Sequence, residues 1–233
     1  MQIAAVQELT LLDYPEKLAA IIFTANCNMR CLYCHNSHFV LPNKIKKIES
    51  SFIPFKIVKN FLKIRKNKLE AVVISGGEPC LQKDLLEKVT EIKKLGYLVK
   101  IDTNGTKPDI LQKLIKQELV DFIALDVKSS PKKAKLITGL EYSTEIKNSI
   151  KLLNKTNIKH EIRTTVLPEF HNLEELQTIA KMIKGCKKWV LQNFHNTSVL
   201  DEKYAHSVGF KPEKLENIKN QLTPLIKEIE IRI

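Results

Sequence analysis

The sequence predicts an α/β fold, an open and partial barrel built from six strand–helix units. Short apolar segments alternate with longer amphipathic segments along the 233 residues, a pattern typical of a parallel sheet covered by helices. Six units are too few for a complete eight-stranded barrel, and they suit either a partial barrel or a doubly wound sheet. Polar residues at the ends of several predicted strands favour the partial barrel, whose active site would lie at that rim.

The predicted strands are short segments rich in Ile, Val, Phe and Thr. They are residues 18–24, 71–75, 97–103, 122–127, 160–167 and 189–194. Helical periodicity is found between them, at residues 55–66, 83–95, 108–118, 144–154 and 173–184. We expect one domain over residues 1–233, with residues 1–16 as an N-terminal lead-in and residues 205–233 as a C-terminal helix and tail.

The formal net charge is +12, with 38 basic and 26 acidic residues. A basic surface can attract nucleic acid. However, only four residues are arginines, and the lysines are spread along predicted helix faces, which favours a solvated surface. No apolar segment approaches the roughly 20 residues that cross a membrane, and the first residues lack a signal-peptide pattern. We therefore expect a cytoplasmic protein without a membrane or nucleic-acid partner.

Three of the five cysteines, Cys27, Cys31 and Cys34, lie within eight residues. This spacing favours a metal or cluster site over disulfide bonds. Thiolates suit iron–sulfur clusters or zinc. Structural zinc usually has four protein ligands, and His35, His38 or Cys80 could supply the fourth, so zinc stays open at this point. Cys80 and Cys186 are otherwise expected to be buried as small apolar side chains.

Further polar motifs follow the predicted strands. In SGGEP, Gly76 and Gly77 permit a close backbone approach and Glu78 offers a charged acceptor, although an ordinary turn would also explain the motif. DTNG begins at Asp102, where the third strand ends, and ALDVK places Asp126 at the end of the fourth. Lys128 could belong to the same site or to the surface.

Arg163 lies within the fifth strand, on the same face as Glu161 and Thr165 because side chains alternate along a strand. A buried arginine needs partners. A substrate carboxylate is one candidate, and an internal ion pair with Glu161 is the alternative. His195, just beyond the sixth strand, is a further candidate for the rim.

The segment CNMRCLYC resembles the CxxxCxxC motif of the radical S-adenosylmethionine (SAM) superfamily, with Tyr33 directly before the last cysteine. The resemblance implies one oxygen-sensitive [4Fe–4S] cluster held by Cys27, Cys31 and Cys34. The fourth iron would be left for the amino and carboxylate groups of SAM, and Tyr33 would lie near the adenine.

The other motifs resemble further parts of the SAM site in the same superfamily. The resemblance implies that the SGGEP motif meets the ammonium group of SAM. It also implies that Asp102 and Thr103, together with Asp126, help to hold a monovalent cation. The cofactor-binding residues implied in this way are Tyr33, Gly76, Gly77, Glu78, Asp102, Thr103, Asn104, Asp126, Arg163 and His195.

Within the superfamily, the chain is most similar to activating enzymes of glycyl-radical enzymes, in particular to the longer anaerobic ribonucleoside-triphosphate reductase activating proteins. The resemblance covers LLDYP, FTANCNMRCLYCHN, ISGGEPCLQKDL, VKIDTNG, ALDVKS, EIRTTVLP and LQNF. It implies an oxidoreductase that cleaves SAM reductively to a 5′-deoxyadenosyl radical, which then abstracts a glycine hydrogen on a partner enzyme. Flavodoxin or ferredoxin would be the reductant, and no catalytic residue beyond the cluster and SAM is implied.

Three alternative functions stay open. The chain could activate another glycyl-radical enzyme of the pyruvate formate-lyase type, although DYPEK stands where those activators usually have a DGPG-type segment. It could act on a small molecule such as a deazapurine precursor. Outside this class, it could be a zinc-binding nucleic-acid protein.

Overall fold

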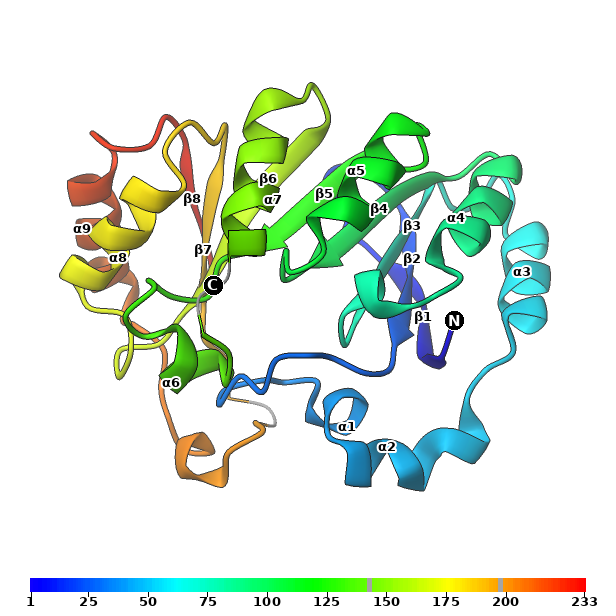
Figure 1. Cartoon of the computed structure of the whole chain (residues 1–233), viewed down its shortest axis with the longest axis horizontal. Coiled ribbons are helices and arrows are strands. Elements are labelled where there is room, and N and C mark those ends of the chain that lie inside the picture. Colours follow the sequence, from blue (N-terminus) through cyan, green and yellow to red (C-terminus); the bar gives the residue numbers. More distant parts are fainter. Residues whose placement is uncertain (142–143, 197–198) are drawn as a thin grey trace. The chain divides into compact units, whose positions relative to one another are not determined.

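The computed structural model describes residues 1–141, 144–196 and 199–233. Its strands follow one another in the sheet in chain order, from β1 to β8, with helices between them (Figure 1). The α/β class of the predicted open, partial barrel is confirmed, and the sheet of the described residues has eight strands where six strand–helix units were predicted. The residues group into two compact units. The first contains Met1–Asn28, His38–Thr103 and Asp109–Ile123, and the second contains Met29–Ser37, Asn104–Pro108 and Ala124–Ile233.

The first unit contains four strands at the start of the chain. They are β1 (Ile3–Thr10), β2 (Ala19–Thr24), β3 (Ala71–Gly76) and β4 (Leu98–Thr103). β2, β3 and β4 are parallel neighbours, as their almost continuous burial predicts, whereas β1 pairs antiparallel with β2. The expected lead-in over residues 1–16 is thus corrected in part, because residues 3–10 form an edge strand. Only the two ends of β1 are buried, so its sequence carries little strand signal.

Helices connect these strands. They are α1 (Ser37–Val40), α2 (Pro42–Ile48), α3 (Phe55–Ile64), α4 (Leu85–Lys94) and α5 (Pro108–Lys116), with 3₁₀ turns η1 (Glu49–Ser51) and η2 (Pro79–Leu81). In α4, the buried residues Leu85, Val89 and Ile92 recur with helical spacing and form its apolar face. Part of the core of this unit gathers around Tyr14, Ile21 and Val73.

The second unit contains the later strands. β5 (Phe122–Asp126) has its last three residues there, followed by β6 (Lys159–Val166), β7 (Trp189–Asn193) and β8 (Ile229–Arg232). β6, β7 and β8 are parallel neighbours. The helices are α6 (Ala134–Thr138), α7 (Thr144–Lys155), α8 (Leu173–Met182) and α9 (Pro212–Leu222), with the 3₁₀ turn η3 (Glu202–Tyr204). α8 and α9 lie side by side beside β7 and β8 (Figure 1).

The C-terminal segment adds a strand that the sequence did not predict. Within residues 205–233, where a helix and a tail were expected, the structure has α9 followed by the strand β8. Arg232 at its end donates two hydrogen bonds to the carboxylate of Glu161 on β6, at 2.9 and 2.7 Å. Glu161 is 1% exposed, and this pair joins the two strands across β7.

We expect Arg232→Met to lower the free energy of unfolding by about 2 kcal/mol, because it leaves the buried Glu161 carboxylate without its bidentate partner. Urea denaturation measures the change. Arg65→Met is the matched control, since Arg65 pairs with Glu8 at an exposed position and such pairs contribute less than about 1 kcal/mol. Equal losses in the two variants would contradict the assignment of Arg232 as the anchor of β8.

In the part of the chain that the structure describes, no helix is both long and apolar enough to cross a membrane.

Candidate functional site

The turn after β3 brings the SGGEP motif against the segment that leads into the cysteine loop. The amide of Gly77 donates to the carbonyl of Thr24, and the amide of Glu78 donates to the carbonyl of Asn26, each at 2.7 Å. A Cβ atom on Gly77 would lie 2.1 Å from the Asn26 oxygen, and one on Gly76, whose φ is +103°, would lie 2.5 Å from the Thr24 nitrogen. Both glycines are therefore required by close backbone contact.

The predicted residues Glu78, Asp102 and Thr103 come together at the ends of β3 and β4. Glu78 is 1% exposed, and its Oε1 accepts hydrogen bonds from the hydroxyl of Thr103 at 2.8 Å and from the amide of Cys80 at 3.0 Å. The hydroxyl of Ser75 donates to Asp102 Oδ2 at 3.2 Å. The first unit thus holds two buried carboxylates, those of Glu78 and Asp102, near the ends of β3 and β4.

Asn104 begins the stretch of the DTNG motif that belongs to the second unit. Its Oδ1 accepts hydrogen bonds from the amide of Thr106 at 3.1 Å and from the Thr106 hydroxyl at 2.7 Å. The carbonyl of Gly105 accepts a hydrogen bond from Ser149 on α7 at 2.7 Å. These bonds tie the loop after β4 to a helix of the second unit.

Asp126, at the end of β5, is bound by two cationic side chains. Arg163 Nε donates to Oδ1 at 2.8 Å, and Lys128 Nζ donates to Oδ2 at 3.2 Å. Burial would raise the pKa of Asp126, but the positive charges of Arg163 and Lys128 outweigh it and lower this pKa to about 2. Lys128 therefore belongs to this cluster, and the alternative of an isolated surface lysine is wrong. The alternative ion pair of Arg163 with Glu161 is wrong as well.

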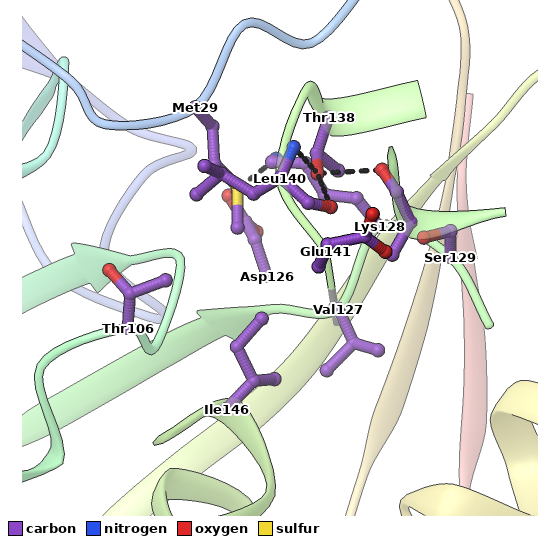
Figure 2. Close-up of a pocket in the computed structure, with 11 residues that line it drawn as sticks. Met29, Thr106, Asp126, Val127, Lys128, Ser129, Thr138, Leu140, Glu141 and Ile146 are labelled. Atoms are coloured by element: carbon purple, nitrogen blue, oxygen red, sulfur yellow. Dashed lines mark hydrogen bonds and ion pairs between the residues drawn. The ribbon is translucent and has the colours of Figure 1, made fainter. Parts of the chain in front are cut away.

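Asp126 and Lys128 also line a pocket of the second unit together with Met29 from the cysteine loop (Figure 2). Thr106 and Ile146 lie on another side of the same pocket. The pocket places a charged cluster and an apolar thioether in one depression, which suits a ligand that carries both a charged and an apolar group.

We expect Asp126→Asn to lower the free energy of unfolding by about 2 kcal/mol at neutral pH, in line with the depressed pKa of Asp126. The stabilisation is complete above the unfolded-state pKa of about 3.9 and is lost as the pH falls through about 2, because protonation removes the charge. Urea denaturation of both proteins between about pH 7 and pH 3 should show the difference shrinking below about pH 4. Asp201→Asn is the control, and a difference independent of pH would contradict the prediction.

The cysteine loop is divided between the two units, with Cys27 in the first and Cys31 and Cys34 in the second. In the second unit, the amides of Arg30 and Leu32 donate to the carbonyls of Thr138 and Ile137 at the end of α6, at 2.7 and 3.1 Å. The described residues contain no group of three His, Cys, Asp or Glu side chains arranged to hold a metal ion. Joint ligation by the three cysteines stays a prediction.

Burial and charge act in opposite directions on the Cys34 thiol, and its pKa is raised on balance. Burial raises the pKa of its thiol, whereas a backbone hydrogen bond from Asn36 and the positive charges of Lys128 and Arg30 act in the opposite direction. Burial would lower the pKa of Lys128, but nearby negative charges, first that of Asp126 and then that of Cys31, raise it. Lys128 therefore stays positively charged, and it lies close to Cys31 and Cys34, two of the predicted ligands.

The two remaining predicted residues, Tyr33 and His195, differ in their burial. Tyr33 is 4% exposed, its ring packs against Phe170 and Phe194, and its hydroxyl donates to the Lys128 carbonyl at 3.4 Å. His195 is exposed after β7. Its role, like that of Tyr33 near adenine, stays a prediction.

Cys80 and Cys186 are both buried, as expected. Burial raises the pKa of each thiol, that of Cys186 to about 12.

Sequence reasoning missed two residues near these sites. Lys100 donates to Asp102 Oδ1 at 2.7 Å, and its position two residues earlier on the same strand is the signal that could have revealed it. His171 is fully buried, and its Nε2 lies 3.0 Å from the carbonyl of Lys128. No local motif marks His171, because its partner lies 43 residues away.

The comparison with family models decides the wider classification. A model described as "Radical SAM superfamily" matches residues 21–183, a span that contains the cysteine loop, both units' carboxylate clusters and Arg163. The chain belongs to the radical SAM superfamily. It is therefore an enzyme, and membership implies a [4Fe–4S] cluster and SAM as its cofactors.

Two relatives of this radical SAM protein are similar over almost their whole length. A protein of Methanocaldococcus jannaschii named "Putative glycyl-radical enzyme activating enzyme" is 37% identical over 237 residues, covering 99% of this chain and 95% of the relative. The pyruvate formate-lyase-activating enzyme of Clostridium pasteurianum is 24% identical, covering 97% of this chain and 98% of that enzyme.

Solved structures support the fold. Streptococcus suis SuiB superposes with a TM-score of 0.68 at 16% identity, covering 91% of this chain and 48% of SuiB. This chain thus spans about half the length of SuiB. SuiB has also been solved with S-adenosylmethionine bound, and that structure superposes with a TM-score of 0.65.

Proposed function

We propose that this radical SAM enzyme activates a glycyl-radical enzyme by abstracting a hydrogen atom from a glycine of that partner. The observation that carries the proposal is the 37% identity over 99% of the chain to the M. jannaschii protein, whose name describes such an activating enzyme. The similarity to the pyruvate formate-lyase-activating enzyme, again over nearly all of both chains, supports the same class.

The residues present suit a [4Fe–4S] cluster. Cys27, Cys31 and Cys34 supply three soft thiolate donors from one loop, and the Lys128 ammonium favours the charged form of Cys31 and Cys34. We assign these cysteines as the three protein ligands of one cluster. When bound and reduced, such a cluster supplies the electron that cleaves SAM into methionine and a 5′-deoxyadenosyl radical.

The chain's own residues bind and orient SAM in this proposal. In the second unit, Asp126 carries one negative charge and Arg163 and Lys128 two positive charges, so the cluster has a net charge of +1 and suits the carboxylate of the methionine moiety. In the first unit, the buried Glu78 carboxylate suits its ammonium group. The remaining assigned binding residues are Tyr33, Gly76, Gly77, Asp102, Thr103, Asn104 and His195.

The partner we propose is an anaerobic ribonucleoside-triphosphate reductase, with flavodoxin or ferredoxin as reductant. The DYPEK segment supports this choice over pyruvate formate-lyase, because it replaces the DGPG-type segment of the activators of that enzyme. The similarity to the C. pasteurianum enzyme keeps pyruvate formate-lyase as the second candidate.

The experiment is an anaerobic incubation of the reconstituted, dithionite-reduced protein with SAM and each candidate partner in parallel. We expect a glycyl signal in electron paramagnetic resonance with the reductase. With the partner labelled by deuterium at glycine, one deuterium should appear in 5′-deoxyadenosine. A signal with pyruvate formate-lyase alone would move the assignment to that enzyme. SAM cleavage without a glycyl signal on either partner would contradict activation of these enzymes.

A further inference from the structure

A buried lysine lies beside one of the carboxylates assigned to the SAM site. Lys100 and Asp102 are two residues apart on β4, so their side chains share one face of the strand. The Lys100 ammonium lies 2.7 Å from Asp102 Oδ1, with side chains that are 2% and 9% exposed. Phe122 covers the ammonium, which lies 5.9 Å from the centre of its ring. The charge of Lys100 is therefore held at Asp102 and shielded from water.

Such a lysine is costly to bury. Removing an ammonium group from water costs several kcal/mol, and an apolar side chain of similar size would pack on the same strand face without this cost. The other oxygen of Asp102 accepts a hydrogen bond from the Ser75 hydroxyl at 3.2 Å. Both carboxylate oxygens of Asp102 thus accept a hydrogen bond. The feature that an apolar side chain at position 100 would not supply is the positive charge.

The resemblance to glycyl-radical activators implies a monovalent cation at Asp102, Thr103 and Asp126. The residues present do not fit that expectation, because both carboxylates already have cationic partners within their own units. Asp102 has Lys100 at 2.7 Å, and Asp126 has Arg163 at 2.8 Å and Lys128 at 3.2 Å. An added metal cation would meet like charge in either unit.

We propose that the Lys100 ammonium is the resident cation at Asp102, so that the protein binds SAM without a monovalent metal ion. Lys100 is a positioning residue, since it acts through Asp102. This proposal rests on the proposed function, because it assigns Asp102 to the SAM site. The proposal identifies the positive charge that Asp102 requires as that of a side chain of this protein, Lys100.

The test measures SAM affinity by calorimetry, on anaerobically reconstituted protein with an oxidised cluster, in potassium, sodium or choline chloride at equal ionic strength. The thermal midpoint of the cluster-free protein is recorded in the same salts. The variants are Lys100→Met, which removes the charge, and Lys100→Arg, which keeps it. Lys93→Met is the matched control, because Lys93 also pairs with a carboxylate of the first unit, that of Asp121 at 2.8 Å.

We expect wild type, Lys100→Arg and Lys93→Met each to bind SAM with an affinity that varies by less than about twofold among the salts. Lys100→Met should bind about tenfold more weakly in choline, and potassium or sodium should restore most of this loss and raise its thermal midpoint.

A tenfold loss for wild type in choline would overturn the proposal, as would an equal weakening of Lys100→Met in all salts. If Lys100→Met does not fold, the SAM affinities of wild type in the three salts and those of Lys100→Gln test the proposal instead. Absence of SAM binding in every salt would instead contradict the proposed function.

Discussion

Replacement of Cys31 by alanine is expected to reduce SAM cleavage to the level of the iron-free protein. Cys31 is 6% exposed and lies in the part of the loop that is bound to the end of α6, so its neighbours keep their backbone positions when the thiol is removed. Two thiolates then remain for a cluster that needs three protein ligands in our assignment. Iron content after anaerobic reconstitution and chromatographic detection of 5′-deoxyadenosine measure the effect.

Cys186→Ala is the matched control for Cys31→Ala. Cys186 is equally buried, at 4% exposure, and has no role in the assigned site. Its replacement should cost about 1 kcal/mol of stability through lost packing and leave iron content unchanged. Full iron content and SAM cleavage in Cys31→Ala would contradict the ligand assignment, and equal iron loss in both variants would show a general folding defect.

Gly77→Ala is expected to destabilise the protein by about 3 kcal/mol or more, because the new Cβ atom would lie 2.1 Å from the carbonyl oxygen of Asn26. The obstacle is backbone, which no side-chain rotation can relieve. The turn after β3 must move, and the hydrogen bond from the Glu78 amide to Asn26 must break or lengthen. Urea denaturation measures the loss, and reduced SAM affinity should accompany it.

Gly96→Ala separates crowding from backbone strain. Gly96 has a φ of +92°, yet a Cβ atom there would meet nothing within 4 Å. Its replacement should therefore cost only the conformational strain of a left-handed alanine, about 1 kcal/mol. If Gly77→Ala is no more destabilising than Gly96→Ala, close backbone contact is not the reason for the glycine at position 77.

The sequence predicted the central strands well because each is a compact apolar segment, with β2 and β7 the clearest examples. It missed β1 and β8, which differ from the central strands in burial. β1 is buried only at its ends and β8 at one residue, so neither shows the pattern of a central strand. Their pairing depends on the exposed edges of β2 and β7, which exist only after the sheet has formed.

The candidate site likewise has parts that the sequence predicted and parts that it did not. Motif spacing identified the three cysteines, SGGEP and DTNG, since each motif is one continuous segment at the end of a strand. The contact between Gly77 and Asn26 could not be read from spacing, because the two residues lie in different segments brought together by strand pairing.

The sequence by itself therefore determined the superfamily and the α/β class, because neighbouring positions along the chain carry these signals. The same signals predict Cys27, Cys31 and Cys34 as cluster ligands. Only the tertiary structure decided the charge partners. Arg163 is bound to Asp126, 37 residues away, and Arg232 to Glu161, 71 residues away. A buried charge pairs with whichever oppositely charged group the fold brings within hydrogen-bond distance. The order of the strands in the sheet decides which residues come that close, whatever their separation along the chain.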